Sequence, residues 1–283
     1  MVMRLLIALL LVDAYVESKE KPDFKNVKGI ELWEGEDLHY CHEGIYDVDE
    51  GDYHCVTYVW NYEAVHVELL HGYPPVIAYR DIIPKRYIND FLKDVGQMET
   101  TNGSSSKLHG KEYKFGHKKT PAIAKVFNRL TSFIPFLNFK SSDPWQVLRF
   151  KRHEHYPPRH DYLDKKDALS KKLGNRFATF AITLKNADSG GETSFPLKAN
   201  AFKVEPGDAM FWTDMETDRE KQYSAAYGDC PVFEGEKVTA ILRLRERGQL
   251  VLEYSPPGGF YNFGMLFSPS LEMLRSIREK AKK

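Results

Sequence analysis

The sequence predicts an α+β protein in which short strands form a sandwich or small barrel and helices pack against them. Strand-like segments recur at short intervals between residues 146 and 244, and turn signals such as Asp188-Ser189-Gly190-Gly191 and Glu205-Pro206-Gly207-Asp208 separate them. Aromatic residues make up 13% of the chain, which favours strands and a thick core over a helical bundle. The 283 residues suffice for one large domain or two small ones.

The expected elements follow in order along the chain. Alternating apolar residues over 56–70 predict half-buried strands. A helix is expected over 84–96, between a proline and a glycine, and a second begins at Thr120-Pro121. The Gly-, Ser- and Lys-rich residues 98–119 between them are expected to form a loop. Later strands are expected at 147–150, 177–184, 201–204, 209–212 and 238–244, followed by an amphipathic helix over 268–283.

Charge and the N-terminus bear on location and partners. The chain has 40 basic and 40 acidic side chains, so its zero formal charge gives no electrostatic case for binding nucleic acid or an anionic membrane. Residues 1–18 combine a basic start, a short apolar run and small residues suited to cleavage, which predicts a secretory signal peptide rather than a buried helix. That run is shorter than the about 20 apolar residues of a membrane span, and no other span is expected. We therefore expect a protein of the secretory pathway, in the lumen of the endoplasmic reticulum or secreted, with a glycosylation site at Asn102.

Three cysteines fit an oxidising compartment. Cys41 and Cys55 lie close together in a polar, glycine-containing stretch, and we expect them to form a disulfide. Cys230 is then the odd cysteine. It is either buried as a small apolar side chain or available for an intermolecular bond, and burial is the preferred interpretation.

Five ordered motifs carry a resemblance to a known family. They are Gly174-Asn175-Arg176-Phe177-Ala178-Thr179-Phe180, residues 190–196, residues 205–212, Cys230-Pro231-Val232 with Gly235 and Lys237, and Glu246-Arg247-Gly248-Gln249. Together they resemble the catalytic domain of the prolyl 4-hydroxylase alpha-subunit-like family, which are Fe(II)- and 2-oxoglutarate-dependent dioxygenases. The resemblance implies a double-stranded β-helix, a jelly-roll or cupin-like small barrel, over residues 76–250, with buttressing helices before it and a C-terminal helix after it. An N-terminal segment at 19–75 and a C-terminal extension at 251–283 flank that domain.

The resemblance also implies an activity and its cofactors. The family hydroxylates peptidyl proline in collagen-like chains with Fe(II), 2-oxoglutarate and ascorbate, and some members pair with a hydroxylase subunit or with protein disulfide isomerase. Two histidines and one carboxylate hold the iron in this family. Here Asp161 matches the carboxylate, whereas Arg159 and Tyr227 occupy the two histidine positions, and Lys237 matches the lysine that pairs with the far carboxylate of 2-oxoglutarate.

Strand geometry decides whether His160 can replace a lost ligand. Side chains at i and i+2 leave a strand on the same face, so Arg159 accompanies Asp161 and His160 points away. A β-bulge that turns His160 onto the metal face is the weaker alternative. Because a guanidinium stays protonated and competes with Fe(II) for the same carboxylate, we expect an Arg159–Asp161 ion pair in place of iron.

These substitutions predict impaired catalysis. Three hypotheses remain open: an active proline dioxygenase, a non-catalytic relative that binds proline-rich or collagen-like peptides, and a partner subunit of an active hydroxylase or of protein disulfide isomerase. Without iron, Lys237 is expected to pair with another anion or a nearby carboxylate.

Overall fold

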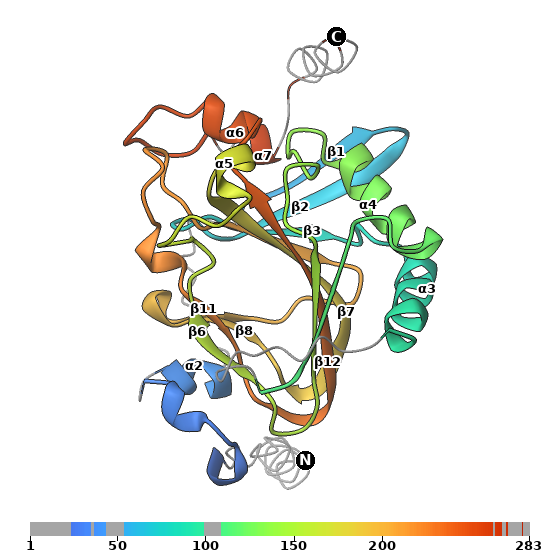
Figure 1. Ribbon diagram of the computed structural model, residues 1–283, viewed down its shortest axis with the longest axis vertical. Helices are drawn as coiled ribbons and strands as arrows, with labels where there is room; N and C mark the ends of the chain where they lie inside the picture. The colour runs from blue at the N-terminus through green and yellow to red at the C-terminus, as the bar shows by residue number, and fades with distance from the viewer. Residues whose placement is uncertain are drawn as a thin grey trace, which may run out of the picture.

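A computed structural model gives the fold of residues 24–34, 37–43, 54–98, 109–262 and 264–267, and of the single residues 270 and 279. Two antiparallel sheets form a barrel-like sandwich, and helices lie along its outside (Figure 1). The fold class is therefore α+β with a predominantly antiparallel sheet structure, as the sequence predicted.

The larger sheet has eight strands in the order β1-β2-β3-β10-β7-β12-β5-β4. Its strands are β1 (Cys55–Trp60), β2 (Glu63–His71), β3 (Val76–Arg80), β4 (Lys111–Phe115), β5 (Trp145–Phe150), β7 (Arg176–Gly190), β10 (Ala209–Thr213) and β12 (Val232–Arg245). Strands β1 and β2, which precede residue 76, extend this sheet at one edge. Strand β4 forms the other edge within residues 98–119, where the sequence predicted a loop; its two lysines, Lys111 and Lys114, are exposed, which suits an edge strand.

The smaller sheet has four strands in the order β6-β11-β8-β9. They are β6 (Tyr156–Arg159), β8 (Thr193–Phe195), β9 (Asn200–Phe202) and β11 (Tyr227–Asp229). From β5 to β12 the chain crosses back and forth from one sheet to the other. As a result, β5, β7, β10 and β12 are neighbours in the larger sheet, and β6, β8, β9 and β11 are neighbours in the smaller one. This winding is the double-stranded β-helix that the sequence predicted.

The faces of the larger sheet contribute to two separate cores. On β12, Val238, Ala240, Leu242 and Leu244 belong to the core that the outer helices cover, whereas Ile241 belongs to the core between the sheets. Because side chains alternate along a strand, Lys237 and Arg243 share the face of Ile241. Two cationic side chains therefore point into the barrel from a single strand.

The outer helices match the predicted ones. Helix α3 (Lys85–Gly96) packs beside α4 (Pro121–Phe133), and both lie on the outside of the larger sheet (Figure 1). The Thr120 hydroxyl accepts a hydrogen bond from the backbone N–H of Ile123, which caps the start of α4. Short helices complete the fold: α2 (Asp37–Glu43), α5 (Ser170–Leu173), α6 (Leu250–Glu253), α7 (Gly264–Phe267) and the 3-10 turns η1 (Phe24–Asn26), η2 (Ile30–Leu32), η3 (Pro196–Lys198) and η4 (Tyr223–Ala225).

The N-terminal residues 24–34 and 37–43 lie on the smaller sheet, with α2 next to β8 and β9. Trp33 donates its indole N–H to Nδ1 of buried His155, at 3.0 Å. The ring of Trp33 also lies so close to Gly228 that a Cβ atom there would come within 2.9 Å of it. Glycine at this position of β11 therefore allows the segment to pack tightly against the sheet.

A disulfide fixes this segment, but with a different pairing from the predicted one. Cys41 is bonded to Cys230, with sulfur atoms 2.06 Å apart, and Cys55 is an exposed free thiol. The predicted Cys41–Cys55 bond is therefore wrong. Proximity in sequence suggested it, but Cys55 begins β1 at the far edge of the larger sheet, whereas α2 reaches the end of β11.

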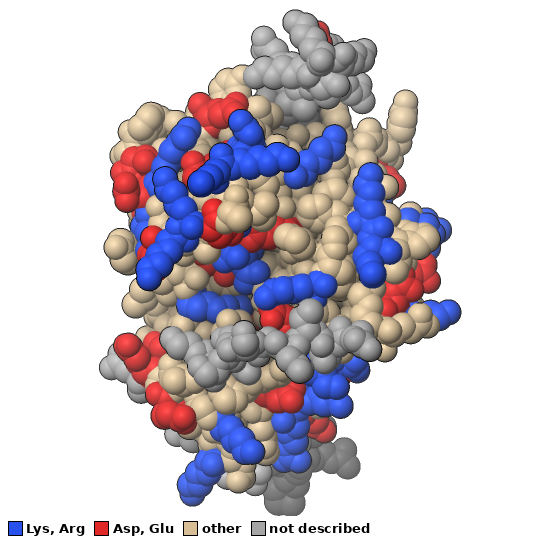
Figure 2. All heavy atoms as spheres, in the orientation of Figure 1, with Lys and Arg blue, Asp and Glu red and all other residues tan. Residues whose placement is uncertain are grey.

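Several predictions lie outside the described residues: the signal peptide at 1–18, the glycosylation site at Asn102 and nearly all of the helix at 268–283. In the part of the chain that is described, no helix is long and apolar enough to cross a membrane. Figure 2 shows basic and acidic side chains on the same face of the molecule, with basic side chains gathered around α5, where Lys171 and Lys172 are exposed.

Candidate functional site

Asp161 lies just past the end of β6, and the Gly174-Asn175-Arg176 motif holds it in place. Asn175 accepts a hydrogen bond from the backbone N–H of Leu163 and donates one to its carbonyl, each at 3.0 Å. Arg176 donates to the backbone carbonyl of Asp161 at 3.1 Å. These contacts direct the carboxylate of Asp161 into the space between the sheets, where it is 3% exposed.

Three side chains surround the Asp161 carboxylate. The Tyr227 hydroxyl donates to Oδ2 at 2.7 Å, and the Thr179 hydroxyl lies 3.0 Å from the same oxygen. Nε of Arg243 lies 2.7 Å from Oδ1 and forms a buried ion pair. Burial alone would raise the pKa of Asp161, but the positive charges, with that of Arg243 foremost, and the bond from Tyr227 hold this pKa well below its usual range. Asp161 is therefore a carboxylate with its own cation.

A second buried acid shares the Thr179 hydroxyl. This hydroxyl lies 2.7 Å from Oδ2 of Asp214 as well as 3.0 Å from Oδ2 of Asp161. One hydroxyl has a single proton to donate, so one of the two acids must supply the other proton. Burial, and next the charge of Asp161, raise the pKa of Asp214 well above its usual value. This raised pKa favours the neutral acid at Asp214, which would leave the single proton of the Thr179 hydroxyl for the Asp161 carboxylate.

Arg159 does not form the predicted ion pair with Asp161. Its Nη2 atom donates to Oδ2 of Asp229 at 3.1 Å, and its guanidinium lies against two aromatic rings, 3.7 Å from the centroid of Tyr156 and 4.3 Å from that of Tyr227. The prediction was wrong because β6 ends at Arg159 and Asp161 lies beyond it, so the two positions do not follow strand alternation. Among the described residues, Nε and Nη1 of Arg159 have no hydrogen-bond partner.

Lys237 is buried and pairs with a carboxylate of the chain itself. Its Nζ atom donates to Oδ1 of Asp229 at 2.9 Å and to the Thr193 hydroxyl at 3.1 Å. Burial opposes ionisation of Asp229, but Lys237, followed by Arg159, lowers the pKa of Asp229 below its usual value. Asp229 therefore bridges two cations. One of them is the Lys237 amino group, which the sequence predicted to bind the far carboxylate of 2-oxoglutarate.

The structure places Tyr227 between Asp161, to which its hydroxyl donates, and Arg159, whose guanidinium lies against its ring. The antiparallel pairing of β6 with β11 places Tyr227 opposite Arg159. His160 lies apart, with its ring edge-on to the Tyr223 ring at 6.2 Å and its pKa lowered mainly by burial. It therefore does not take the place of a lost ligand on Asp161.

Four residues of the site were not identified from the sequence: Thr179, Asp214, Asp229 and Arg243. The signal for Arg243 was available, because it lies in the strand predicted at 238–244 and has the same parity as Lys237, which directly precedes that strand. Thr179 lies in a recognised motif, but nothing in the sequence showed that its hydroxyl would bridge two acids. The role of Asp229 required the register of β6 against β11.

The residues present do not fit Fe(II). Such a centre needs two histidines and a carboxylate with open positions, whereas the three matching positions hold a guanidinium, a carboxylate and a phenol. The phenol of Tyr227 stays protonated, because burial raises its pKa well above the usual value. Among the described residues, no group of three or more His, Cys, Asp and Glu side chains is arranged to hold a metal ion.

The strand order, with Asp161 held between the two sheets, defines a double-stranded β-helix protein. The chain is 26% identical over 190 residues to prolyl 4-hydroxylase subunit alpha-1 of Rattus norvegicus, covering 62% of this chain and 35% of that protein. It is 25% identical over 209 residues to prolyl 4-hydroxylase subunit alpha-2 of Caenorhabditis elegans, covering 69% of this chain and 38% of the relative. These relatives support the resemblance to a prolyl 4-hydroxylase-like family that the sequence motifs indicated.

Other comparisons complete this description. A solved structure of the viral collagen prolyl hydroxylase from Paramecium Bursaria Chlorella virus-1, in its 2OG complex, is 21% identical, with a TM-score of 0.48 over 59% of this chain and 93% of that one. No family model matches the chain. The alignments span little more than a third of the length of the two curated relatives.

Proposed function

We propose that this chain is a non-catalytic prolyl 4-hydroxylase-like protein of the secretory pathway. The observation that supports this most directly is the ion pair between Arg243 and Asp161. The only carboxylate in the expected ligand set already has a cation, and both histidine positions hold residues that do not bind Fe(II) readily. At an effective dielectric of about 20, unit charges 4 Å apart interact by about 4 kcal/mol, so Fe(II) entering beside Arg243 would meet strong repulsion.

The cosubstrate position supports the same proposal. An incoming 2-oxoglutarate would need to displace Asp229 from Lys237, to which it is held at 2.9 Å inside the barrel. Displacement would leave the carboxylate of Asp229 buried with one fewer cation, which is costly. The site is therefore expected to be filled by the chain's own ion pairs.

Binding of a peptide is the non-catalytic role that a specific observation favours. Tyr73, Tyr223 and Phe260 are 43%, 70% and 76% exposed. Aromatic side chains line the grooves in which several recognition domains bind proline-rich segments. A role as partner subunit of an active hydroxylase or of protein disulfide isomerase is the alternative that the family suggests.

Two measurements on the unmodified protein test the loss of catalysis. Decarboxylation of 2-oxoglutarate with a proline-rich peptide, Fe(II) and ascorbate is expected not to exceed that of an Asp161→Asn variant, which keeps the size of the side chain. Anaerobic titration is expected to show no stoichiometric Fe(II). Turnover well above the variant, or one tightly bound Fe(II) per chain, would overturn the proposal.

A further inference from the structure

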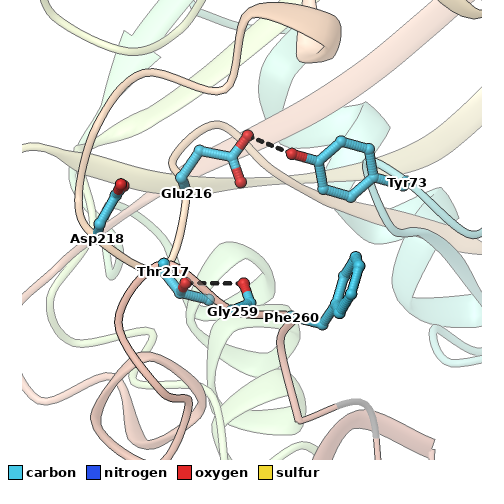
Figure 3. Close-up of a pocket in the computed structure, with 7 residues that line it drawn as sticks. Tyr73, Glu216, Thr217, Asp218, Gly259 and Phe260 are labelled. Carbon is cyan, nitrogen blue, oxygen red and sulfur yellow. Dashed lines mark hydrogen bonds between the residues drawn. The ribbon is translucent and has the colours of Figure 1, made fainter.

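A pocket outside the barrel site combines aromatic rings with carboxylates. Its volume is about 310 Å³, and it is lined by Tyr73, Glu216, Thr217, Asp218, Gly258, Gly259 and Phe260 (Figure 3). These residues come from three segments: the turn between β2 and β3, the loop after β10 and the loop after α6. A volume of this size lies at the lower end of the range of small-ligand sites, about 300–1,000 Å³.

Contacts between the three segments build the pocket. The Tyr73 hydroxyl donates to Oε1 of Glu216 at 2.6 Å, and the Thr217 hydroxyl donates to the carbonyl of Gly259 at 2.9 Å (Figure 3). The Tyr73 and Phe260 rings meet edge to face, with centroids 6.3 Å apart. The pocket thus has an aromatic corner with the carboxylate of Glu216 directed toward one of its rings.

The seven residues that line the pocket include two carboxylates and no cation, although the ammonium group of Lys198 lies beside the pocket, against the ring of Tyr73. The loop after β10 carries two cations, but Arg219 pairs with Glu246 at 3.6 Å and Lys221 with Asp164 at 3.1 Å, so both are directed to other acids. Glu216, as acceptor and as a nearby charge, raises the pKa of Tyr73, and Asp218 contributes in the same direction. A ligand entering here meets two carboxylates and two exposed ring systems.

We propose that this pocket binds a single lysine side chain of a peptide. The aliphatic stem would lie on Phe260 and Tyr73, as long cationic side chains do on apolar surface, while the charged head meets Glu216 and Asp218. The chain itself shows that the Tyr73 ring accepts a cation, because Nζ of Lys198 lies 5.3 Å from its centroid. This inference does not depend on whether the Asp161 site can catalyse a reaction.

Saturation-transfer NMR with two matched probes tests the proposal on the whole protein. N-acetyl-lysine N-methylamide is expected to receive saturation at its side chain, and N-acetyl-norleucine N-methylamide, which lacks the ammonium group, is expected to bind at least tenfold more weakly. Equal binding of the two probes, or no binding of the lysine probe, would overturn the proposal.

Variants locate the binding. Phe260→Ala and Glu216→Gln are each expected to weaken lysine binding at least tenfold, because each removes one half of the recognition. Tyr62→Ala is the matched control, since Tyr62 is a fully exposed aromatic residue in the turn between β1 and β2. If the lysine probe binds Phe260→Ala and Glu216→Gln as well as it binds the unmodified protein, the pocket is not the site.

Discussion

Arg243 and Asp161 form a buried ion pair across the interior of the barrel, with 2.7 Å between Nε and Oδ1. Arg243 comes from β12 of the larger sheet, whereas Asp161 follows β6 of the smaller one. The pair therefore links the two sheets through the interior of the barrel. The residues around this pair affect the stability of the protein and its affinity for a metal ion, and variants of them test both.

Replacing Arg243 alone is expected to destabilise the protein by about 3–5 kcal/mol, because it leaves a buried carboxylate without its closest cation. Arg243→Met keeps most of the side-chain volume and removes the charge. Urea unfolding followed by circular dichroism gives the change in the free energy of unfolding. A loss below 1 kcal/mol would show that Arg176 and Tyr227 are sufficient to stabilise Asp161.

The double variant Asp161→Asn with Arg243→Met provides the control for that measurement. Because it removes both charges, it is expected to be more stable than the sum of the two single changes predicts. Equality with that sum would mean that the two side chains do not interact energetically.

Restoring the two histidines is expected not to create a metal site by itself. Arg159→His with Tyr227→His places histidines at the two positions that match the family's ligands in sequence but leaves Arg243 on the carboxylate. The triple variant that adds Arg243→Met is expected to bind Co(II), used as an oxygen-stable probe for Fe(II), at least tenfold more tightly than the double variant. The visible absorption of bound Co(II) reports the binding. Equal affinity in the two variants would contradict the assignment of Arg243 as the competing cation.

Asp214→Asn is expected to stabilise the protein at pH 7. The folded-state pKa of Asp214 lies well above its usual value, so the folded protein keeps a proton that the unfolded chain releases above about pH 4. The contribution of Asp214 to the free energy of unfolding therefore falls as the pH rises. Asparagine mimics the neutral acid and does not titrate, so the variant lacks this pH dependence. Each unit of pKa shift corresponds to about 1.4 kcal/mol.

Unfolding of the unmodified protein and of Asp214→Asn between pH 3 and pH 8 checks this prediction. The advantage of the variant should shrink as the pH falls toward 3, because both proteins are then neutral at this position. A variant that is destabilised equally at every pH would show that Asp214 acts through packing rather than through its proton.

The disulfide pairing has a direct chemical test. Under non-reducing conditions, iodoacetamide is expected to modify Cys55 of the folded protein and to leave Cys41 and Cys230 unmodified. Cys41→Ser with Cys230→Ser should lower the free energy of unfolding by about 2–5 kcal/mol, because the bond closes a long loop. Cys55→Ser serves as the control and is expected to leave stability nearly unchanged. Recovery of a Cys41–Cys55 linked peptide would contradict the structure.

Much of the fold was predictable from local signals. The proline and the threonine cap at the helix starts, the alternating strands and the glycine-rich turns each express a backbone preference that neighbouring residues determine. Strand β4 was missed because three of its five residues are charged, namely Lys111, Glu112 and Lys114, and because its buried and exposed positions do not alternate. An edge strand tolerates this composition, and a hydrophobic pattern does not reveal it.

The candidate site was predictable as a set of positions but not as a set of pairs. Motif spacing identified Asp161, Tyr227 and Lys237, yet the partner of each cation depends on which strands face each other. Arg159 pairs with Asp229 through the β6–β11 register, and Arg243 reaches Asp161 across the barrel. The partners in these ion pairs are tens of positions apart in the sequence, so local backbone preferences do not determine which residues pair.

The bond between Cys41 and Cys230 also sets an order of events during synthesis. The two cysteines are separated by 189 residues, which take roughly 10–40 s to synthesise at about 5–20 residues per second. Throughout that interval the only cysteine available to Cys41 within the chain is Cys55, fourteen positions away. An oxidant that acts early would therefore make the shorter loop first, and the native bond would then require thiol exchange after β11 has emerged.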